Sequence, residues 1–523
     1  MEVPLTPLEF MRRTRRLHAN REGVVDGASR WTYGEFFDRC DRWSSALYEL
    51  GVRKGDRVAY IAPNTHAQLE SFYAVPQLGA VLVPINYRLV ADDFKYLIQH
   101  SGATIVCADR DYLETVEAIR GDLAGVRHFV ALEDARDGWL DYETLVSTAS
   151  SGFARPDINE SDLVTINYTS GTTSRPKGVM ITHRNAWINA VGALLHVPMT
   201  CEDRYLWTLP MFHANGWTFT WIVTAVGAAH VCLRKVDATT VFRLAREERI
   251  SALCAAPTVL IPLANAPDEM KRDVPRGVRV LTAGAPPAAV TIARLEDGLG
   301  WTVTQVYGLT ETAPFITVCE PRPEHAVLSR EERAIIKARQ GVELITSGEL
   351  RVVSPSGDEV PHDGATIGEI VARGNVIMAG YYNDPAATAA VIRDGWFHTG
   401  DAAVVHPDGY VEIRDRLKDV IISGGENISS VEVEAMLLRH PAVQEAAVVG
   451  LPDEKWGEAP HAWIVTKGGA VVDDGELRRF CREQLAHFKV PHSFTIVAEL
   501  PKTATGKIQK FVLRGGRPGI SRQ

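Results

Sequence analysis

Residues 168–178 read Tyr168-Thr169-Ser170-Gly171-Thr172-Thr173-Ser174-Arg175-Pro176-Lys177-Gly178 and follow an apolar run over 163–166. We predict that this loop lies between a strand and a helix. Glycine lacks the Cβ atom that would block close approach, so N–H groups, hydroxyls and a cation can close around phosphate oxygens. The loop is not a Walker A loop, because Lys177 is followed by Gly178 rather than by Ser or Thr. Its composition alone is also typical of a flexible surface loop.

The overall composition is that of an ordinary globular protein. The chain has 523 residues, of which 46% are hydrophobic and 23% are charged. This length exceeds what one hydrophobic core usually supports, so we expect two or more domains. The formal net charge of −9 argues against a general nucleic-acid-binding protein, which would present a basic surface.

The cysteines and the apolar segments indicate the compartment. Seven scattered cysteines without a Cys-x-x-Cys pair are typical of buried thiols in a reducing environment. No run of roughly 20 apolar residues predicts a membrane span, and the N-terminus lacks the apolar stretch of a signal peptide. We therefore expect a cytoplasmic protein without an integral membrane segment.

Helical and extended patterns alternate over the first 306 residues. We predict helices over 33–50 and 67–78, and short strands over 57–61, 80–84, 104–107 and 128–132. A second series from about 180 to 306 includes predicted strands over 252–255 and 278–281. Such alternation predicts parallel strands with helical crossovers, and hence two α/β halves with a ligand crevice at the carboxyl ends of the strands.

The pattern changes after about residue 340. Short strands separated by Gly, Pro and Asp turns are predicted over 349–353, 368–372 and 410–413, so we expect a β-rich subdomain there. Helices over 429–438 and 475–485 then alternate with strands over 446–449 and 462–465. We therefore predict an α/β fold with a large N-terminal domain, residues 1–415, and a small α+β C-terminal domain, residues 416–523.

A second motif reads Gln305-Val306-Tyr307-Gly308-Leu309-Thr310-Glu311-Thr312. Glu311 follows directly after a predicted strand, from where its carboxylate can face the phosphate loop. Carboxylate oxygens suit Mg²⁺ that is bound to ATP. An isolated Glu is far more often a surface residue, so this prediction depends on the whole motif.

The loop and the second motif resemble signatures of the adenylate-forming superfamily, which comprises acyl-CoA synthetases, adenylation domains of peptide synthetases and luciferases. The resemblance covers roughly residues 5 to 515 and implies that the small C-terminal domain is a mobile lid on an ATP- and acyl-binding N-terminal domain. Three further strings resemble the family's later motifs in the same order: Thr399-Gly400-Asp401, Arg416-Leu417-Lys418-Asp419 and Pro501-Lys502-Thr503-Ala504-Thr505-Gly506-Lys507.

The resemblance implies a set of nucleotide-binding residues. Tyr307 would stack on adenine, and Asp401 would hold the ribose together with Arg416. The other members of this set are Thr169, Ser170, Gly171, Thr172, Thr173, Gly284, Ala285, Gln305, Gly308, Thr310 and Lys418.

The resemblance also implies the metal ligands, the catalytic lysines and the hinge. Glu311 would bind Mg²⁺ together with the hydroxyl of Thr169. Lys177 and Lys507 would be catalytic, because a cation stabilises the charge that builds up as a carboxylate attacks phosphorus. Lys418 would be the hinge about which the C-terminal domain rotates between two steps.

The stretch Leu209-Pro210-Met211-Phe212-His213-Ala214-Asn215-Gly216-Trp217 narrows the substrate. Amino-acid-adenylating domains place an Asp where His213 stands, and an imidazole cannot pair with an ammonium group. We therefore expect a plain carboxylic acid, with His213 among the catalytic residues. The stretch resembles long-chain fatty acyl-CoA synthetases, in which an aromatic residue at the position of Trp217 gates the acyl tunnel; a buried core residue is the alternative. Gly425 and Trp456 match family positions along the pantetheine arm of CoA.

By this resemblance we expect an AMP-forming carboxylic acid:CoA ligase of fatty acid or lipid metabolism that uses Mg²⁺, ATP and CoA. A carboxylate would attack the α-phosphorus of ATP, and CoA would then displace AMP from the acyl-adenylate. A homodimer is also implied. The alternatives are an aryl- or methylmercaptopropionate-CoA ligase, a stand-alone adenylating enzyme, a luciferase-like monooxygenase, and a non-catalytic acyl or nucleotide sensor.

Overall fold

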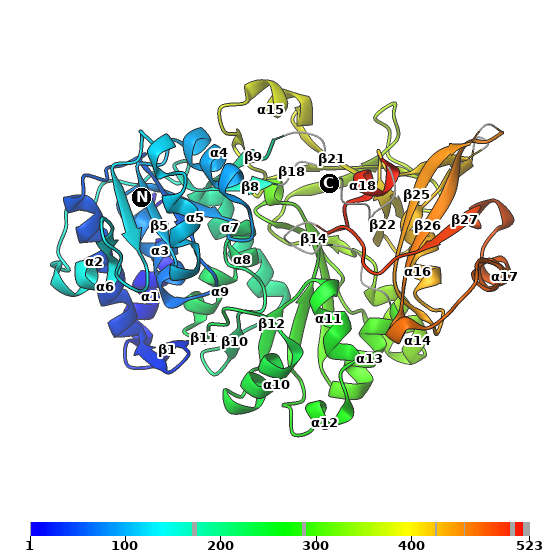
Figure 1. Ribbon diagram of the computed structural model, residues 1–523, viewed down its shortest axis with the longest axis horizontal. Helices are drawn as coiled ribbons and strands as arrows, with labels where there is room; N and C mark the ends of the chain where they lie inside the picture. The colour runs from blue at the N-terminus through cyan, green and yellow to red at the C-terminus, as the bar shows by residue number, and fades with distance from the viewer. Residues whose placement is uncertain are drawn as a thin grey trace.

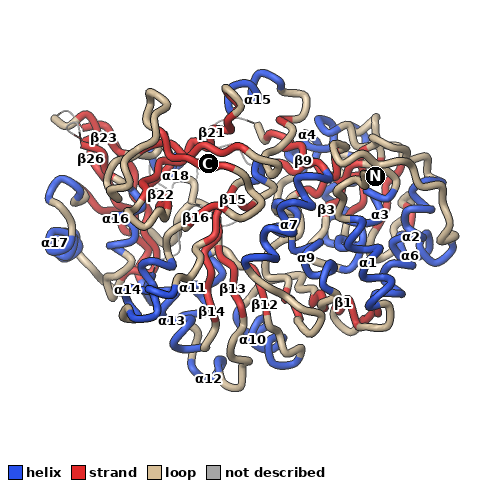
Figure 2. Tube along the Cα trace, turned by 180° about the vertical axis from the view of Figure 1, so that it is seen from behind, coloured by secondary structure: helices blue, strands red, loops and turns tan. Residues whose placement is uncertain are grey.

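The computed structural model describes residues 2–169, 175–284, 289–423, 426–453, 455–502 and 508–515. Two α/β halves make up most of the molecule, and a smaller α+β part from the C-terminal end of the chain lies at the side opposite the N-terminal half (Figures 1 and 2). The predicted fold class is therefore confirmed.

The first half is built on an eight-stranded sheet. Its central strands are parallel, and each pair is connected through a helix, as the alternating pattern predicts. In order across the sheet the strands are β19 (Gly380–Tyr381), β9 (Lys177–Thr182), β8 (Leu163–Thr169), β4 (Val81–Ile85), β3 (Arg57–Ile61), β5 (Ile105–Ala108), β6 (His128–Ala131) and β7 (Leu140–Asp141).

The second half is built on a nine-stranded sheet. Its first two strands by sequence come from the N-terminal end of the chain, so this half is not the continuous series from about 180 to 306 that the pattern predicts. In order the strands are β16 (Val342–Glu343), β15 (Phe315–Val318), β14 (Thr302–Gly308), β13 (Arg279–Thr282), β12 (Ala252–Cys254), β10 (Arg204–Leu206), β11 (Ala229–Val231), β1 (Glu22–Asp26) and β2 (Ser29–Thr32).

The local prediction around the phosphate loop is wrong in one respect. The loop connects β8 to an antiparallel strand, β9, and the helix begins only at His183. Thr169 and Lys177 face each other at the loop end of this hairpin. The six-residue run over 177–182 lies between two other strands of the sheet, and this pairing outweighs the local signal for a helix.

Two smaller sheets follow. The third contains β17 (Glu349–Val353), β18 (Gly368–Arg373), β21 (Trp396–Val405), β20 (Ile392–Arg393) and β22 (Val411–Arg416), and is the predicted β-rich subdomain. The fourth contains β24 (Glu426–Ile428), β23 (Ile421–Ser423), β26 (Gly457–Thr466), β25 (Val443–Asp453) and β27 (Ser493–Ile496).

The helices cover the sheets in layers. One buried core lies between the two large sheets, with α2, α3, α7 and α9 contributing to it, while α4 and α5 cover the outer face of the first sheet and α10, α11 and α13 that of the second. The helices are α1 (Leu8–His18), α2 (Tyr33–Glu49), α3 (His66–Gln77), α4 (Ala91–Ser101), α5 (Leu113–Glu117), α6 (Tyr142–Thr148), α7 (His183–His196), α8 (Ala214–Trp217), α9 (Phe219–Val226), α10 (Ala238–Glu247), α11 (Pro257–Ala264), α12 (Asp268–Lys271), α13 (Ala289–Leu299), α14 (Arg330–Lys337), α15 (Pro385–Val391), α16 (Ser430–Leu437), α17 (Asp474–Gln484) and α18 (Lys510–Arg514).

Helix α2 illustrates how local sequence and packing agree. Thr32 caps its first turn, and the carboxylate of Glu35 accepts a hydrogen bond from the backbone N–H of Thr32. Such a cap stabilises a helix by about 1 kcal/mol. The inner face then buries Phe36 and Trp43, so packing between the sheets stabilises the helix further.

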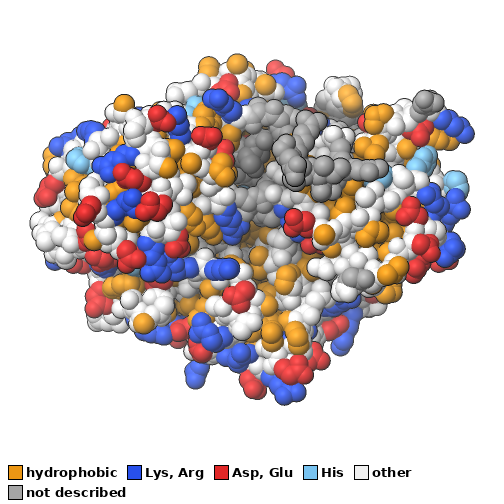
Figure 3. Space-filling view, in the orientation of Figure 1, with side chains coloured by type: hydrophobic (Ala, Val, Ile, Leu, Met, Phe, Trp, Pro, Cys, Tyr) orange, Lys and Arg blue, Asp and Glu red, His pale blue; other side chains and the backbone are white. Residues whose placement is uncertain are grey.

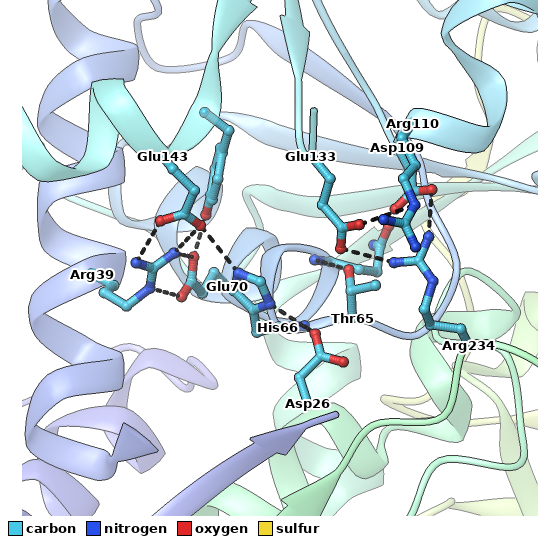
Figure 4. Close-up of polar contacts among 12 residues, drawn as sticks. Asp26, Arg39, Thr65, His66, Glu70, Asp109, Arg110, Glu133, Glu143 and Arg234 are labelled. Carbon is cyan, nitrogen blue, oxygen red and sulfur yellow. Dashed lines mark hydrogen bonds and ion pairs between the residues drawn. The ribbon is translucent and has the colours of Figure 1, made fainter. Parts of the chain in front are cut away.

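Ion pairs join the two halves at the carboxyl ends of their strands (Figure 4). Arg234, which follows β11, pairs with Asp109 at 2.7 Å and with Glu133 at 2.8 Å, and both carboxylates belong to the first half. Nearby, His66 Nδ1 lies 2.8 Å from Asp26 of β1, and its Nε2 lies 3.2 Å from Glu143. These contacts hold the two sheets in a fixed relation around the site described below.

The surface carries charges of both signs. Lys, Arg, Asp and Glu side chains are interspersed over the face in Figure 3, in agreement with the modest net charge of −9. In the part of the chain that the structure describes, no helix is long and apolar enough to cross a membrane.

Candidate functional site

Three predicted motifs, those of Tyr307, Asp401 and Arg416, meet at the buried carboxylate of Asp401. Tyr307 Oη, at the end of β14, donates a hydrogen bond of 2.6 Å to Asp401 Oδ2, and Arg416 Nε lies 2.9 Å from Asp401 Oδ1. Asp401 and Arg416 face each other across β21 and β22, so the antiparallel register brings the two motifs together. Arg416 also donates to the carbonyl of Thr399 at 3.2 Å.

The electrostatics of this cluster keep Arg416 charged. Burial alone would lower the pKa of Arg416, but the attraction of Asp401, followed by Tyr307 and Glu311, outweighs it and raises the pKa. Burial, together with the Asp401 charge, raises the pKa of Tyr307 well above its usual value, so this hydroxyl stays a donor. The cluster therefore presents a fixed, paired carboxylate.

A second cluster lies around Glu311. Glu311 is in a short 3₁₀ turn over 310–312, and its Oε1 accepts a hydrogen bond of 2.8 Å from the hydroxyl of Tyr381. Lys177 Nζ lies 4.8 Å from the centre of the Tyr381 ring. Tyr381 thus joins the end of the phosphate hairpin to the second motif, and this residue was not predicted from the sequence.

The donor set around Glu311 suits a magnesium ion that is bound mainly by ATP. Among the described residues no group of three or more His, Cys, Asp or Glu side chains could hold a metal ion. Mg²⁺ usually takes one or two protein carboxylates and completes its shell with phosphate oxygens and water. The single carboxylate of Glu311, with the Thr169 hydroxyl near the hairpin end, fits that arrangement.

Two predicted glycines are required for different reasons. A Cβ atom on Gly308 would lie 1.7 Å from the carbonyl oxygen of Pro314, so no larger residue fits there. Gly284 has a φ of +89° and open space around it, so its backbone conformation is what favours glycine. Close backbone packing thus requires glycine at the end of β14, and a left-handed backbone favours it just after β13.

Two buried polar side chains on those strands have no hydrogen-bond partner among the described residues. They are Thr282, through Oγ1, and Gln305, through Oε1. They are neighbours in register on β13 and β14. Gln305 was predicted and Thr282 was not. A buried polar atom without a partner costs free energy, so this pair is suited to bind a polar group.

Trp217 lies in the main core and is 4% exposed. Its ring contacts Phe315 with ring centres 5.9 Å apart, in the segment that follows the second motif. His213 precedes the same turn, and its backbone N–H donates to the carbonyl of Pro210 at 3.1 Å. Trp217 therefore lies close to the nucleotide motifs and is also a core residue.

Of the remaining predicted residues, Lys418, Trp456 and Thr310 are described by the structure and the others are not. Lys418 follows the Asp401 cluster, and burial lowers its pKa. Trp456 is 41% exposed at the turn between β25 and β26, and no contact of its side chain with the Asp401 or Glu311 cluster is found among the described residues. Thr310 begins the 3₁₀ turn of Glu311. Six predicted residues lie outside the described residues, together with Lys507, which is predicted to be catalytic: Ser170, Gly171, Thr172, Thr173, Ala285 and Gly425.

Comparison with family models finds two matches. A model described as AMP-binding enzyme matches residues 11–382, and a model of the AMP-binding enzyme C-terminal domain matches residues 432–507. The two matched ranges together include Tyr307 of the Asp401 cluster, the residues of the Glu311 cluster and the predicted tail motif over 501–507.

Named relatives match over nearly the whole chain. 4-Hydroxybutyrate–CoA ligase 2 of Metallosphaera sedula is 44% identical over 524 residues, covering 98% of this chain and 94% of the relative. Trans-cinnamate:CoA ligase of Petunia hybrida is 39% identical over 535 residues, with the same two coverages of 98% and 94%. Among solved structures, an anthranilate CoA ligase in complex with anthranoyl-AMP is similar with a TM-score of 0.88 at 25% identity, and 98% of each chain is covered.

Proposed function

The chain belongs to the AMP-binding enzyme family and is an ATP-dependent carboxylic acid:CoA ligase, and from this premise we propose which of its residues carry each step. ATP, CoA and a carboxylic acid are its substrates. The observation that supports the assignment best is the joining of Tyr307, Asp401 and Arg416, because three separate motifs converge there on one carboxylate.

In the first step the substrate carboxylate forms a bond to the α-phosphorus of ATP, and the bond from that phosphorus to pyrophosphate breaks. Asp401 binds the ribose hydroxyls and Tyr307 contacts adenine. Lys177 and Lys507 neutralise charge on the phosphate oxygens in the transition state. No general base is required because the carboxylate is already a nucleophile.

Glu311 and Thr169 would hold the magnesium ion of the nucleotide, which would supply charge neutralisation on the phosphate oxygens. The hydroxyl of Tyr381 orients the Glu311 carboxylate through its 2.8 Å hydrogen bond. Burial, followed by the Glu311 charge, raises the pKa of Tyr381, so this hydroxyl keeps its proton at neutral pH.

In the second step the sulfur of CoA forms a bond to the acyl carbonyl carbon, and the bond to AMP breaks. Before this step Lys507 leaves the site as the C-terminal domain rotates about Lys418, which admits the pantetheine arm of CoA. We place the domain boundary after residue 415, where β22 ends at Arg416 and β23 begins only at Ile421. Gly425 and Trp456 line the path of the pantetheine arm in the rotated state.

We propose that the acid is compact, aliphatic or aromatic, rather than a long-chain fatty acid. The turn that follows His213 is filled by aromatic side chains, with Trp217 packed on Phe315 and Phe219 stacked on Tyr205 at 4.9 Å. The names of the relatives, which refer to 4-hydroxybutyrate and trans-cinnamate, support the same size class.

The decisive experiment measures AMP and acyl-CoA formation across acids of two to eighteen carbons, with benzoate, cinnamate, 4-hydroxybutyrate and methylmercaptopropionate. We expect equal amounts of AMP and acyl-CoA, dependent on CoA and Mg²⁺, with a maximum among the compact acids. A maximum at sixteen or eighteen carbons would refute the size assignment. AMP formation without any acyl-CoA would refute the role of CoA.

A further inference from the structure

A closed ring of three side-chain hydrogen bonds connects the phosphate hairpin to the turn that carries Trp217. Thr165 Oγ1 donates to Asn167 Oδ1 at 2.7 Å, and Asn167 Nδ2 donates to Asn215 Oδ1 at 2.9 Å. Asn215 Nδ2 then donates back to Thr165 Oγ1 at 3.0 Å. The three side chains are 0%, 1% and 4% exposed, so water does not compete for these bonds.

The ring lies on the same face of β8 as the predicted metal ligand. Successive side chains of a strand alternate between its two faces, so Thr165, Asn167 and Thr169 share one face. Asn167 is thus the direct neighbour of Thr169 along that face. The ring therefore supports the strand at the point where it enters the phosphate loop.

At its other end the ring holds a turn with an unusual backbone. Five consecutive residues over 214–218 have φ values between 45° and 65°. This left-handed conformation is unfavourable for most residues, and Asn is among those that tolerate it best. A Cβ atom on Gly216 would lie 2.5 Å from the Trp207 ring, so the turn is also packed closely from behind. Such a turn persists only where its surroundings hold it in place.

The turn also contacts the segment after the second motif. Trp217 packs on Phe315, and Asn189 Nδ2 donates to the carbonyl of Phe315 at 2.7 Å and to that of Thr312 at 3.3 Å. Thr312 is the last residue of the 3₁₀ turn that holds Glu311. The strained turn thus contacts the phosphate strand through the ring and Phe315 through Trp217, and Asn189 of α7 connects Phe315 to the end of the Glu311 turn.

We propose that Asn215 is a positioning residue that couples recognition of the acid to binding of ATP. An acid packed against Trp217 stabilises the turn in its left-handed conformation, and the ring transmits this constraint to β8 and hence to Thr169. ATP bound at Thr169 stabilises the same arrangement from the other end, so each ligand strengthens binding of the other. This inference depends on the proposed function, because it assumes that the acid lies against Trp217.

The test uses variants that break the ring without imposing backbone strain. Asn215→Gly removes the side chain but accepts a positive φ at no steric cost. Thr165→Val removes the hydroxyl and keeps the branched shape, whereas Thr165→Ser keeps the hydroxyl. Coupling is measured as the ratio of the Kd values of α,β-methylene-ATP without and with saturating acid. Selectivity is measured as kcat/KM for the preferred acid divided by kcat/KM for the homologous acid that is two carbons longer.

We expect Asn215→Gly and Thr165→Val to bring the coupling ratio close to one and to change the selectivity ratio by about 10- to 100-fold, which is the size expected for losing the two ring hydrogen bonds that each side chain makes. Thr165→Ser, which keeps the hydroxyl, should leave the coupling ratio and the selectivity ratio near their wild-type values. The matched control is Ser44→Ala, which removes a buried hydroxyl that donates to Cys40 at 2.9 Å and Ala74 at 2.8 Å, between α2 and α3. It should lower the melting temperature and change neither ratio.

The inference is overturned if the ring variants melt earlier but keep the wild-type coupling and selectivity, because the ring would then be purely structural. If Asn215→Gly does not fold, the Thr165→Val and Thr165→Ser pair decides the question alone. Failure of the proposed function would look different, because the wild-type protein itself would then form no acyl-CoA.

Discussion

The hydroxyl of Tyr381 donates a 2.8 Å hydrogen bond to Glu311 Oε1, while the Tyr381 ring lies 4.8 Å from Lys177 Nζ. One side chain thus orients the carboxylate assigned to magnesium and contacts the lysine assigned to phosphate. Glu311 lies between β14 and β15 of the second sheet, whereas Tyr381 belongs to β19, which pairs with β9 in the first sheet.

Glu311→Gln should slow adenylate formation and raise the Mg²⁺ concentration needed for half-maximal rate. An amide oxygen is neutral and is a poorer ligand for a hard cation than a carboxylate oxygen. Tyr381→Phe, which only removes the orienting hydrogen bond, should shift the Mg²⁺ titration less, in the same direction. A Mg²⁺ titration of Glu311→Gln that overlays the wild type would exclude Glu311 from the metal site.

Asp401→Asn should raise the KM for ATP about 10- to 100-fold, the range expected for weakening a buried charged hydrogen bond by about 1–3 kcal/mol. The KM for CoA should change little. The comparison with 2′-deoxy-ATP is the check: wild type should discriminate against it, and Asp401→Asn should do so much less. Equal discrimination by both proteins would mean that Asp401 does not bind the ribose.

Lys507→Ala should reduce adenylation about a thousandfold, because losing one transition-state charge contact costs roughly 3–4 kcal/mol. Thioester formation from pre-made acyl-adenylate should be largely retained. The matched control is Lys502→Ala, since Lys502 pairs with Glu445 at 2.7 Å on the C-terminal domain. Equal loss in both half-reactions would contradict the domain rotation.

Trp217→Ala should have two effects, because this residue is both buried and close to the site. Truncation of a buried Trp costs roughly 3–5 kcal/mol of stability, and rate should also depend differently on acyl length. Trp301→Ala is the control, since Trp301 is 2% exposed in a separate core cluster. It should melt earlier with an unchanged acyl profile. An unchanged profile for Trp217→Ala as well would exclude Trp217 from the acyl site.

The His66 cluster predicts a loss of stability in mildly alkaline solution (Figure 4). Burial alone would lower the pKa of His66, but hydrogen bonds to Asp26 and Glu143 raise it to about 9. Because the pKa of His66 is higher in the folded state, its contacts with Asp26 and Glu143 stabilise the fold fully below pH 6.5, the pKa of the unfolded state. This stability is lost as pH rises through 9. The contribution is at most about 3 kcal/mol.

Denaturant midpoints between pH 6 and 10 measure this effect, and His66→Gln should flatten the profile because an amide does not titrate there. Glu143 should give the stability a second pH dependence, in acid solution. Hydrogen bonds from His66 and Arg39 overcome its burial and lower its pKa to about 2, so its contribution is lost as pH falls from 4.5 through 2. An identical alkaline slope in wild type and His66→Gln would contradict the assignment.

Local sequence patterns predicted the central parallel strands β3 to β6 of the first half, β12 and β13 of the second half, and helices α2 and α3, because buried parallel strands are short apolar runs between amphipathic helices. The predicted helix over 33–50 is α2, for example, and the predicted strand over 57–61 is β3. The phosphate hairpin was predicted wrongly, since the choice between strand and helix over 177–182 depends on β19, which is about 200 residues away in the sequence.

The sequence by itself determined which side chains the chain offers to the reaction: Glu311, Asp401, Arg416 and Lys177 stand in motifs whose order and spacing resemble one family. Only the tertiary structure decided which of them meet, because contacts such as Tyr307 with Asp401 join strands of two different sheets and residues far apart in the chain. Tyr381, Thr282 and the ring of Thr165, Asn167 and Asn215 were missed for the same reason. Each is an ordinary residue of a strand or turn, and its role arises from the neighbouring residues that folding places beside it.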